Sequence, residues 1–118
     1  MGKIIRVKFY RTESGNEPVR EWLSEMTIQD KKLIGTDIRT VEMGWPKGLP
    51  LVRKLDRDLW EVRIKLPNKI VRVFFTVVDG SMILLHGIIK KGQKTPKEDF
   101  GLSRKRKNEV LSGRKDEQ

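Results

Sequence analysis

Basic side chains carry the most evident chemistry in this sequence, and they gather in three groups in its second half. The first group is Arg53, Lys54 and Arg57. The second group is Arg63, Lys65, Lys69 and Arg72, and the third is Lys90, Lys91, Lys94 and Lys97. Each group lies within an apolar run or beside its end, where a meander of strands would bring the groups together. They predict an anion-binding concavity, although most single Lys and Arg side chains are simply solvated.

Groups that could move a proton are fewer. His86 is the only histidine, and imidazole is the usual acid–base side chain near neutral pH, but a structural role fits its place in an apolar run better. Asp56, Asp58 and Glu61 lie close together, yet basic residues interrupt them, which disfavours a paired-carboxylate site. Cysteine is absent, which excludes a thiol nucleophile and a cysteine zinc site.

The known catalytic motifs do not occur either. The sequence has no Walker loop, nucleophile elbow, His-Glu-x-x-His motif or Gly-rich dinucleotide fingerprint, so we expect neither a metal nor a cofactor. Cations alone can still neutralise a phosphate, lower the pKa of a neighbouring lysine and stabilise a pentacoordinate phosphorane. RNA supplies its own nucleophile, the 2′-hydroxyl, so a basic pocket with one deprotonable group could cleave it without a metal.

The overall charge points to the same class of ligand. The 118 residues include 26 Lys and Arg against 16 Asp and Glu, a formal net charge of +10. This excess predicts a polyanionic partner: nucleic acid, an anionic membrane surface or an acidic protein. No apolar stretch approaches the ~18 residues that cross a bilayer, and the first nine residues lack the apolar core of a secretory signal. We therefore expect a cytoplasmic protein without a membrane partner.

The N-terminal elements that would position these groups follow from hydrophobic periodicity. Residues 3–9 alternate between apolar and basic side chains, which predicts a half-buried strand. Residues 18–26 and 28–41 show the spacing of two short amphipathic helices. Pro18 suits the first turn of the first helix, and Thr27 suits the N-cap of the second.

The C-terminal half predicts strands over 59–66, 70–78 and 81–90 and a basic helix over 96–111. Pro96 would occupy the first position of this helix. The Asp79-Gly80 pair predicts a two-residue type I′ turn between the last two strands. The expected fold is therefore α+β, in the order β-α-α-β-β-β-α, with a small, twisted, mainly antiparallel sheet. Two N-terminal helices cover one face, the opposite face stays open and basic, and the C-terminal helix is short. We expect one domain over residues 1–112 and a disordered tail over 113–118.

The same turn sets an expected register for the last hairpin. Counting back from Val78 opposite Ser81 places Arg72 opposite Gly87, on the sheet face of Ile83 and Leu85. His86 then lies on the other face, unless a β-bulge changes the order.

Three segments together resemble a known family. They are Leu59-Trp60-Glu61-Val62-Arg63, Arg72-Val73-Phe74-Phe75 and the run LLHGIIKKGQKTP at 84–96. The sequence resembles the phage-derived, HigB-like branch of the RelE/ParE toxin superfamily over nearly its whole length. The resemblance implies a RelE-like fold and the toxin of a type II toxin–antitoxin pair. Such a toxin is an mRNA interferase, a ribosome-dependent endoribonuclease that cleaves mRNA and inhibits translation. A helix-turn-helix, HigA-like antitoxin protein neutralises it.

The resemblance also implies roles for individual residues. Arg63 and Arg72 match basic positions on the second and third strands and would hold the scissile phosphate. Lys90 or Lys91 matches the basic residue that ends the fourth strand and would act as a base or a second phosphate clamp. RelE has a tyrosine in its final segment where the nearest aromatic residue here is Phe100, so the general base stays open between a lysine, His86 after a bulge, and a ribosomal group. The expected outer RNA-binding residues are Arg53, Lys54, Arg57, Lys65, Lys94 and Lys97.

Apart from its catalytic role, Arg72 is expected to be an exposed strand arginine, so that Arg72→Ala would stop growth arrest and leave the fold nearly intact. Two other functions stay open at this point. One is a ParE-like inhibitor of DNA gyrase, which shares the fold without nuclease chemistry. The other is a catalytically inert protein that binds nucleic acid or an antitoxin.

Overall fold

Eight elements make up the part of the chain that the structure, a computed structural model, describes: residues 4–46, 48, 50–90, 92 and 94–116. They are β1 (Arg6–Phe9), α1 (Pro18–Ser24), α2 (Ile28–Met43), β2 (Val52–Asp56), β3 (Leu59–Lys65), β4 (Ile70–Val78), β5 (Ser81–Lys90) and α3 (Lys97–Asp116). The strands form one sheet in the order β1-β5-β4-β3-β2. Strand β1 runs parallel to β5, and the other neighbours are antiparallel. The expected α+β class with a mainly antiparallel sheet is confirmed.

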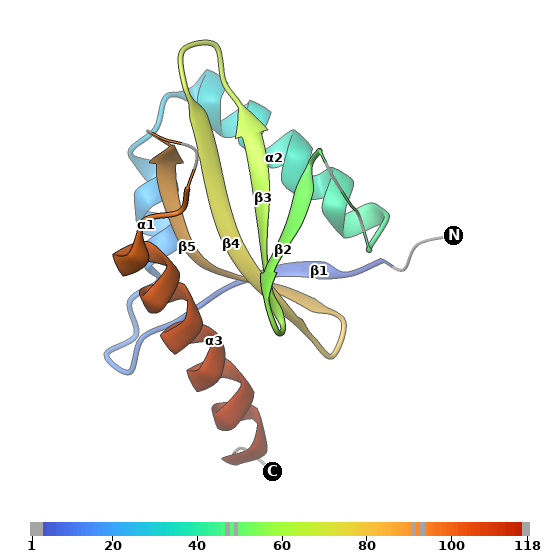
Figure 1. Ribbon diagram of the computed structural model, residues 1–118, viewed down its shortest axis with the longest axis vertical. Helices are drawn as coiled ribbons and strands as arrows, with labels where there is room; N and C mark the ends of the chain where they lie inside the picture. Colours follow the sequence, from blue (N-terminus) through green and yellow to red (C-terminus); the bar gives the residue numbers. More distant parts are fainter. Residues whose placement is uncertain (1–3, 47, 49, 91, 93, 117–118) are drawn as a thin grey trace.

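Helices α1 and α2 lie together on one face of this sheet, as expected (Figure 1). Pro18 opens α1, and the Thr27 hydroxyl accepts a hydrogen bond from the Asp30 backbone N–H, 3.1 Å away, at the start of α2. Pro18 and Thr27 therefore mark the starts of the two helices, as the sequence predicts. The helices bury Val19, Ile34 and Val41 against a cluster that includes Val62, Val73 and Phe75 of the strands.

The structure contains a strand, β2, that the sequence analysis did not predict. It pairs with β3 through a tight turn at Arg57-Asp58, where Asp58 has a φ of 55°. Aspartate tolerates this left-handed conformation, but Arg-Asp is not a preferred hairpin pair, so the turn leaves a weak signal in the sequence. Arg53 and Lys54 consequently lie on a strand at the edge of the sheet.

The β4–β5 hairpin has the expected turn. Asp79 and Gly80 have φ angles of 49° and 75°, as a type I′ turn requires, and Val78 lies opposite Ser81. The register in this part of the hairpin is therefore confirmed.

Further along the hairpin, a β-bulge changes the register. Phe75 lies opposite Leu84, whereas Phe74 lies opposite His86, so Leu85 is the extra residue in β5. Arg72 lies opposite Ile88, and the expected pairing with Gly87 is wrong. The bulge also moves His86 onto the face that Phe74 and Arg72 share.

Helix α3 lies on the face opposite α1 and α2 (Figure 1). Its Phe100 and Val110 pack against a second apolar cluster that contains Leu59, Phe74 and Leu85. The expectation of a fully open face is therefore wrong. The end of the sheet where β3 ends and β4 begins stays uncovered by α3 on this side (Figure 1).

The C-terminal helix is also not short: it has 20 residues and reaches Asp116, beyond the expected end near residue 111. Pro96 lies just before it and accepts the first helical hydrogen bond from the Phe100 N–H, 3.0 Å away. Residues 117–118 of the expected tail lie outside the described residues.

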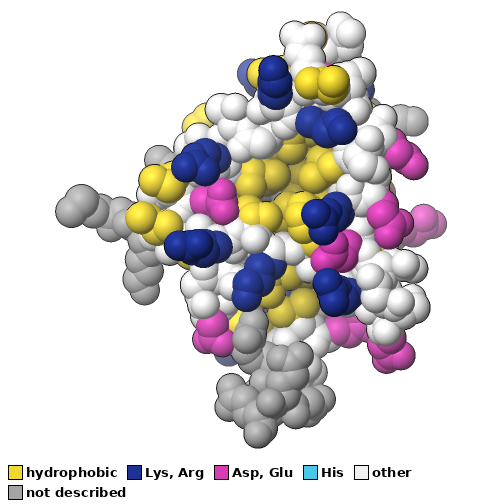
Figure 2. Space-filling model, turned by 180° about the vertical axis from the view of Figure 1, so that it is seen from behind, with side chains coloured by type: hydrophobic (Ala, Val, Ile, Leu, Met, Phe, Trp, Pro, Cys, Tyr) yellow, Lys and Arg dark blue, Asp and Glu magenta, His cyan; other side chains and the backbone are white. Residues whose placement is uncertain are grey.

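The face that carries α1 and α2 is hollowed at its centre. Figure 2 shows apolar side chains gathered in this hollow, with Lys and Arg and a few Asp and Glu side chains around it. On α2, Ile28 and Met43 also expose 72% and 53% of their surface. Apolar surface of this kind on a small protein commonly marks a contact with another protein.

Candidate active site

Charged side chains from three adjacent strands meet at the uncovered end of the α3 face. Strand pairing builds a first row from Arg53 of β2, Glu61 of β3, Phe74 of β4 and His86 of β5. In the next row, Arg63 of β3 lies opposite Arg72 of β4. The three arginines therefore share one face, because residues two apart on a strand point to the same side.

Glu61 is fully buried at the centre of this arginine cluster. Its Oε2 lies 2.9 Å from Arg53 Nη2, and its Oε1 lies 3.4 Å from Arg72 Nε. A buried carboxylate needs such partners, because desolvation of an unpaired charge is costly. Like charges directly opposite on neighbouring strands repel, so Glu61 also offsets the pairing of Arg63 with Arg72.

Arg72 is only 1% exposed, so the expectation of an exposed strand arginine is wrong. Its Nη1 donates a hydrogen bond to Thr95 Oγ1, 2.8 Å away, in the segment that leads into α3. Burial lowers the pKa of Arg72, while the charge of Glu61 opposes this shift. The guanidinium stays charged, because its ordinary pKa is far above neutrality.

Arg63 is half-buried beside it, and its backbone N–H donates to the Leu51 carbonyl oxygen at 2.8 Å. Arg63 lines a cavity of about 410 Å³ that Asp37 and Lys65 also line. Burial raises the pKa of the Asp37 carboxyl. Lys65 is exposed at the end of β3, on the rim of the arginine cluster.

A second cavity, of about 260 Å³, adjoins Arg72 and is lined by two members of the third basic group, Lys90 and Lys94. Its lining includes Arg72, Lys90, Lys94 and Asp99. Desolvation lowers the pKa of Lys90, and the charges of Arg63 and Arg72 lower it further. The cavity thus combines three cations with one carboxylate. Lys91 lies outside the described residues.

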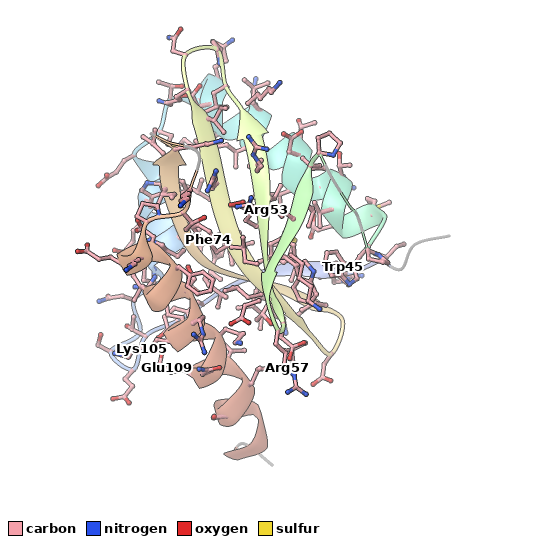
Figure 3. The ribbon with its side chains drawn as sticks, viewed as in Figure 1. Trp45, Arg53, Arg57, Phe74, Lys105 and Glu109 are labelled. Atoms are coloured by element: carbon pink, nitrogen blue, oxygen red, sulfur yellow. The ribbon has the colours of Figure 1, made fainter. Side chains whose placement is uncertain are left out.

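His86 contacts Asp99, one of the residues that line this cavity. Its Nε2 lies 2.7 Å from Asp99 Oδ1, and its ring stacks on Phe74 with centroids 5.9 Å apart. Figure 3 labels Phe74 between β4 and α3, which marks the position of this stack. The β-bulge therefore places the imidazole near Arg72 but fixes it against Asp99.

Tyr10, the only tyrosine in the sequence, lies elsewhere. Its hydroxyl donates a hydrogen bond to the Glu109 carboxylate, which Figure 3 shows on the C-terminal half of α3, far from Arg53. Burial and the contact with Glu109 raise the pKa of Tyr10 to about 12. Tyr10 therefore does not replace the tyrosine that RelE carries in its final segment.

Not all the expected RNA-binding residues join the arginine cluster. Lys54 points to the other face, where its Nζ lies 5.8 Å from the centroid of the Trp60 ring. Arg57 occupies the β2–β3 turn, at the opposite end of β2 from the cluster (Figure 3). Lys97 is exposed at the first position of α3.

Three residues of the site were not expected from the sequence. Glu61 alternates with Arg63, which puts the two on one face, but nothing local shows that this face is buried there. Thr95 and Asp99 flank the start of α3, and an acidic residue in a first helical turn usually has a purely local explanation. Their approach to Arg72 and His86 depends on where α3 packs.

Two further properties concern metals and membranes. Among the described residues, no three His, Cys, Asp or Glu side chains lie close enough to hold a metal ion. In the same part of the chain, no helix has the length and apolar character to cross a membrane.

Fold and site together define a small α+β protein with a cluster of cations at one open end of its sheet. The family model of phage-derived Gp49-like proteins (DUF891) matches residues 21–108, and the chain belongs to this family. The family is associated with toxin–antitoxin systems. A search of curated proteins gives no match to the chain.

Proposed function

We propose that this protein is the toxin of a type II toxin–antitoxin system and that it cleaves ribosome-bound mRNA. The observation that carries the proposal is the arginine cluster: Arg53, Arg63 and Arg72 lie on three adjacent strands, next to a cavity lined by Lys90 and Lys94. Several cations held this close together favour a ligand with concentrated negative charge, such as an RNA phosphate. Membership of a toxin–antitoxin-associated family supports the same class of function.

The proposed chemistry uses these cations to stabilise charge. The 2′-hydroxyl of the RNA attacks the adjacent phosphorus, and the bond to the 5′-oxygen of the next nucleotide breaks. Arg63 and Arg72 hold the phosphate and neutralise the charge that grows in the phosphorane. Lys90 or Lys91 contacts the same phosphate, and Arg53, Lys65, Lys94 and Lys97 bind flanking RNA. The products are a 2′,3′-cyclic phosphate and a 5′-hydroxyl.

Such a toxin needs a protein partner that silences it, and we propose a helix-turn-helix antitoxin in this role. The apolar hollow between basic side chains in Figure 2 and the exposed Ile28 and Met43 support a protein partner. The positive charge of the chain favours acidic residues on that partner, which would speed association at low salt.

Expression in cells followed by primer extension on mRNA tests the proposal. We expect growth arrest with cuts in phase with codons, and cut ends that carry a 2′,3′-cyclic or 3′-phosphate. The Arg63→Gln variant should lose the cuts, whereas Arg57→Gln, at the other end of the sheet, should keep them. Ends with a 3′-hydroxyl would contradict the mechanism. Intact mRNA with arrested DNA supercoiling would indicate a ParE-like gyrase inhibitor, and intact mRNA without arrest an inert binding protein.

A further inference from the structure

The cavity beside Arg72 contains one acid among its cations, and the proposed chemistry above gives that acid no role. Asp99 lines this cavity together with Arg72, Lys90 and Lys94. A pocket that only binds phosphate gains nothing from a carboxylate, because the carboxylate repels the phosphate. A pocket that also removes a proton from a hydroxyl group needs such a base.

His86 fixes the position of Asp99. Its Nε2 lies 2.7 Å from Asp99 Oδ1, and stacking on Phe74, at an interplanar angle of 16°, sets the orientation of the imidazole ring. His86 engages Oδ1, so a role of Asp99 toward a ligand in the cavity would fall to its second oxygen. The carboxylate is thereby oriented by a neighbour whose own rotation is restricted.

The backbone supports the same orientation. Asp99 lies in the first turn of α3, where the helix dipole stabilises a negative charge. Its carbonyl oxygen accepts a hydrogen bond from Ser103 Oγ at 2.8 Å, within the same helix. Thr95, in the segment before α3, accepts the hydrogen bond from Arg72 and ties this segment to β4. Arginine and carboxylate thus line one small cavity, and each is held by a neighbour.

We infer that Asp99 is the general base of the proposed ribonuclease and that His86 is its positioning residue. In this step an Asp99 oxygen accepts the proton of the 2′-hydroxyl as the 2′-oxygen bonds to phosphorus. The bond from phosphorus to the 5′-oxygen breaks, and the leaving oxygen takes a proton from the Lys90 ammonium. The enzyme then holds a neutral carboxylic acid and a neutral amine, and proton exchange with water restores both. The inference rests on the proposed function.

Single-turnover cleavage of mRNA in the ribosomal A site tests this role. Asp99→Asn keeps an oxygen that accepts from His86 but removes the base, so we expect the cleavage rate to fall by ~10²–10⁴. Binding to ribosomes that carry an uncleavable 2′-deoxy mRNA should not weaken. Glu98→Gln is the matched control, since it removes the same charge from the exposed neighbouring residue, and it should leave the rate unchanged. Asp99→Glu should recover part of the rate, and His86→Gln should lower the rate less than Asp99→Asn does.

The outcomes separate this inference from the proposed function. If the parental protein leaves A-site mRNA intact, the proposed function fails and the inference fails with it. If the parental protein cleaves and folded Asp99→Asn cleaves equally fast, the inference alone is overturned. If Asp99→Asn unfolds at the assay temperature, Asp99→Glu decides: a folded Asp99→Glu protein no faster than Asp99→Asn assigns Asp99 to structure and overturns the inference.

Discussion

Glu61 and Arg72 show that the cation cluster depends on a buried charge of opposite sign. Both side chains are at most 1% exposed, and Glu61 also contacts Arg53, which is 41% exposed. Without Glu61, the guanidinium of Arg72 would lie buried next to Arg63 and Arg53, whose charges repel it. We therefore regard Glu61 as the residue that keeps the arginines in place.

At the residue scale, we predict that Arg72→Ala lowers both stability and cleavage. Removal of Arg72 leaves Glu61 buried with Arg53 as its remaining partner, and we expect a loss of ~3 kcal/mol in the free energy of unfolding. Adding Glu61→Gln should restore most of this stability, because the buried charge that has lost one of its two partners is then gone. Cleavage should stay ~10²–10³ lower in both variants, since the transition state has lost a charged donor.

Urea unfolding and single-turnover cleavage below the melting temperature measure the two effects separately. Arg72→Lys is the control that retains a positive charge, and it should keep partial activity because a lysine lacks the two-pronged geometry of a guanidinium. Parental cleavage by the folded double variant would remove Arg72 from the active site.

At the scale of elements, the bulge in β5 and the contact of α1 with β5 decide which β5 residues lie on each face of the sheet. Leu85 is the extra residue, so His86 faces α3 while Gly87 faces α1. At Gly87 the Trp22 ring of α1 packs directly on the backbone: a Cβ atom there would lie 2.2 Å from Trp22 Cζ3. The glycine is therefore required by the close approach of α1.

We predict that Gly87→Ala destabilises the protein by ~1–3 kcal/mol, because the Trp22 ring must move out of its packed position. Gly35→Ala is the matched control, since Gly35 lies inside α2 with nothing within 4 Å of the added Cβ. That change should stabilise the protein by ~0.5–1 kcal/mol through the higher helix propensity of alanine. Chemical denaturation of both variants checks the prediction, and equal stability of the two would show that Trp22 is not held against β5.

At the scale of the whole molecule, cations occur at both ends of the sheet, but the two ends hold them differently. At the uncovered end, Arg53, Arg63, Arg72, Lys90 and Lys94 come close together. At the other end, α3 closes over the β2–β3 turn, and the buried Lys107 donates to the Arg57 carbonyl oxygen at 2.7 Å. We expect RNA to bind at the uncovered end.

The salt dependence of binding distinguishes the two ends. Each phosphate contact adds ~0.7–0.9 to the slope of log affinity against log salt concentration. We predict that Arg53→Gln lowers the slope for binding to ribosomes by about this amount, whereas Arg57→Gln leaves it unchanged. Figure 3 shows both arginines, which differ in position and not in chemistry. A lower slope for Arg57→Gln alone would place the RNA at the end of the sheet covered by α3 and would contradict the proposal.

The sequence by itself determined the features that depend on neighbouring residues in the chain. Pro18 and Thr27 mark helix starts because they satisfy or remove local N–H donors, and Asp79-Gly80 fixes a turn because both residues adopt positive φ. Alternation over β3 puts Glu61 and Arg63 on one face, which the strand predicted over 59–66 already implies. The α+β class follows from these local signals.

Only the tertiary structure decided how the elements meet. Strand β2 forms because β3 offers it a partner, and its Arg57-Asp58 turn carries little signal of its own. The bulge at Leu85 shifts the register of β5, and a single extra residue is enough to move His86 from one face to the other. Packing of α3 on that face buries Arg72 and brings Thr95 and Asp99 to the site. These contacts join residues distant in the chain, and their free energy depends on burial and register that no short stretch of sequence encodes.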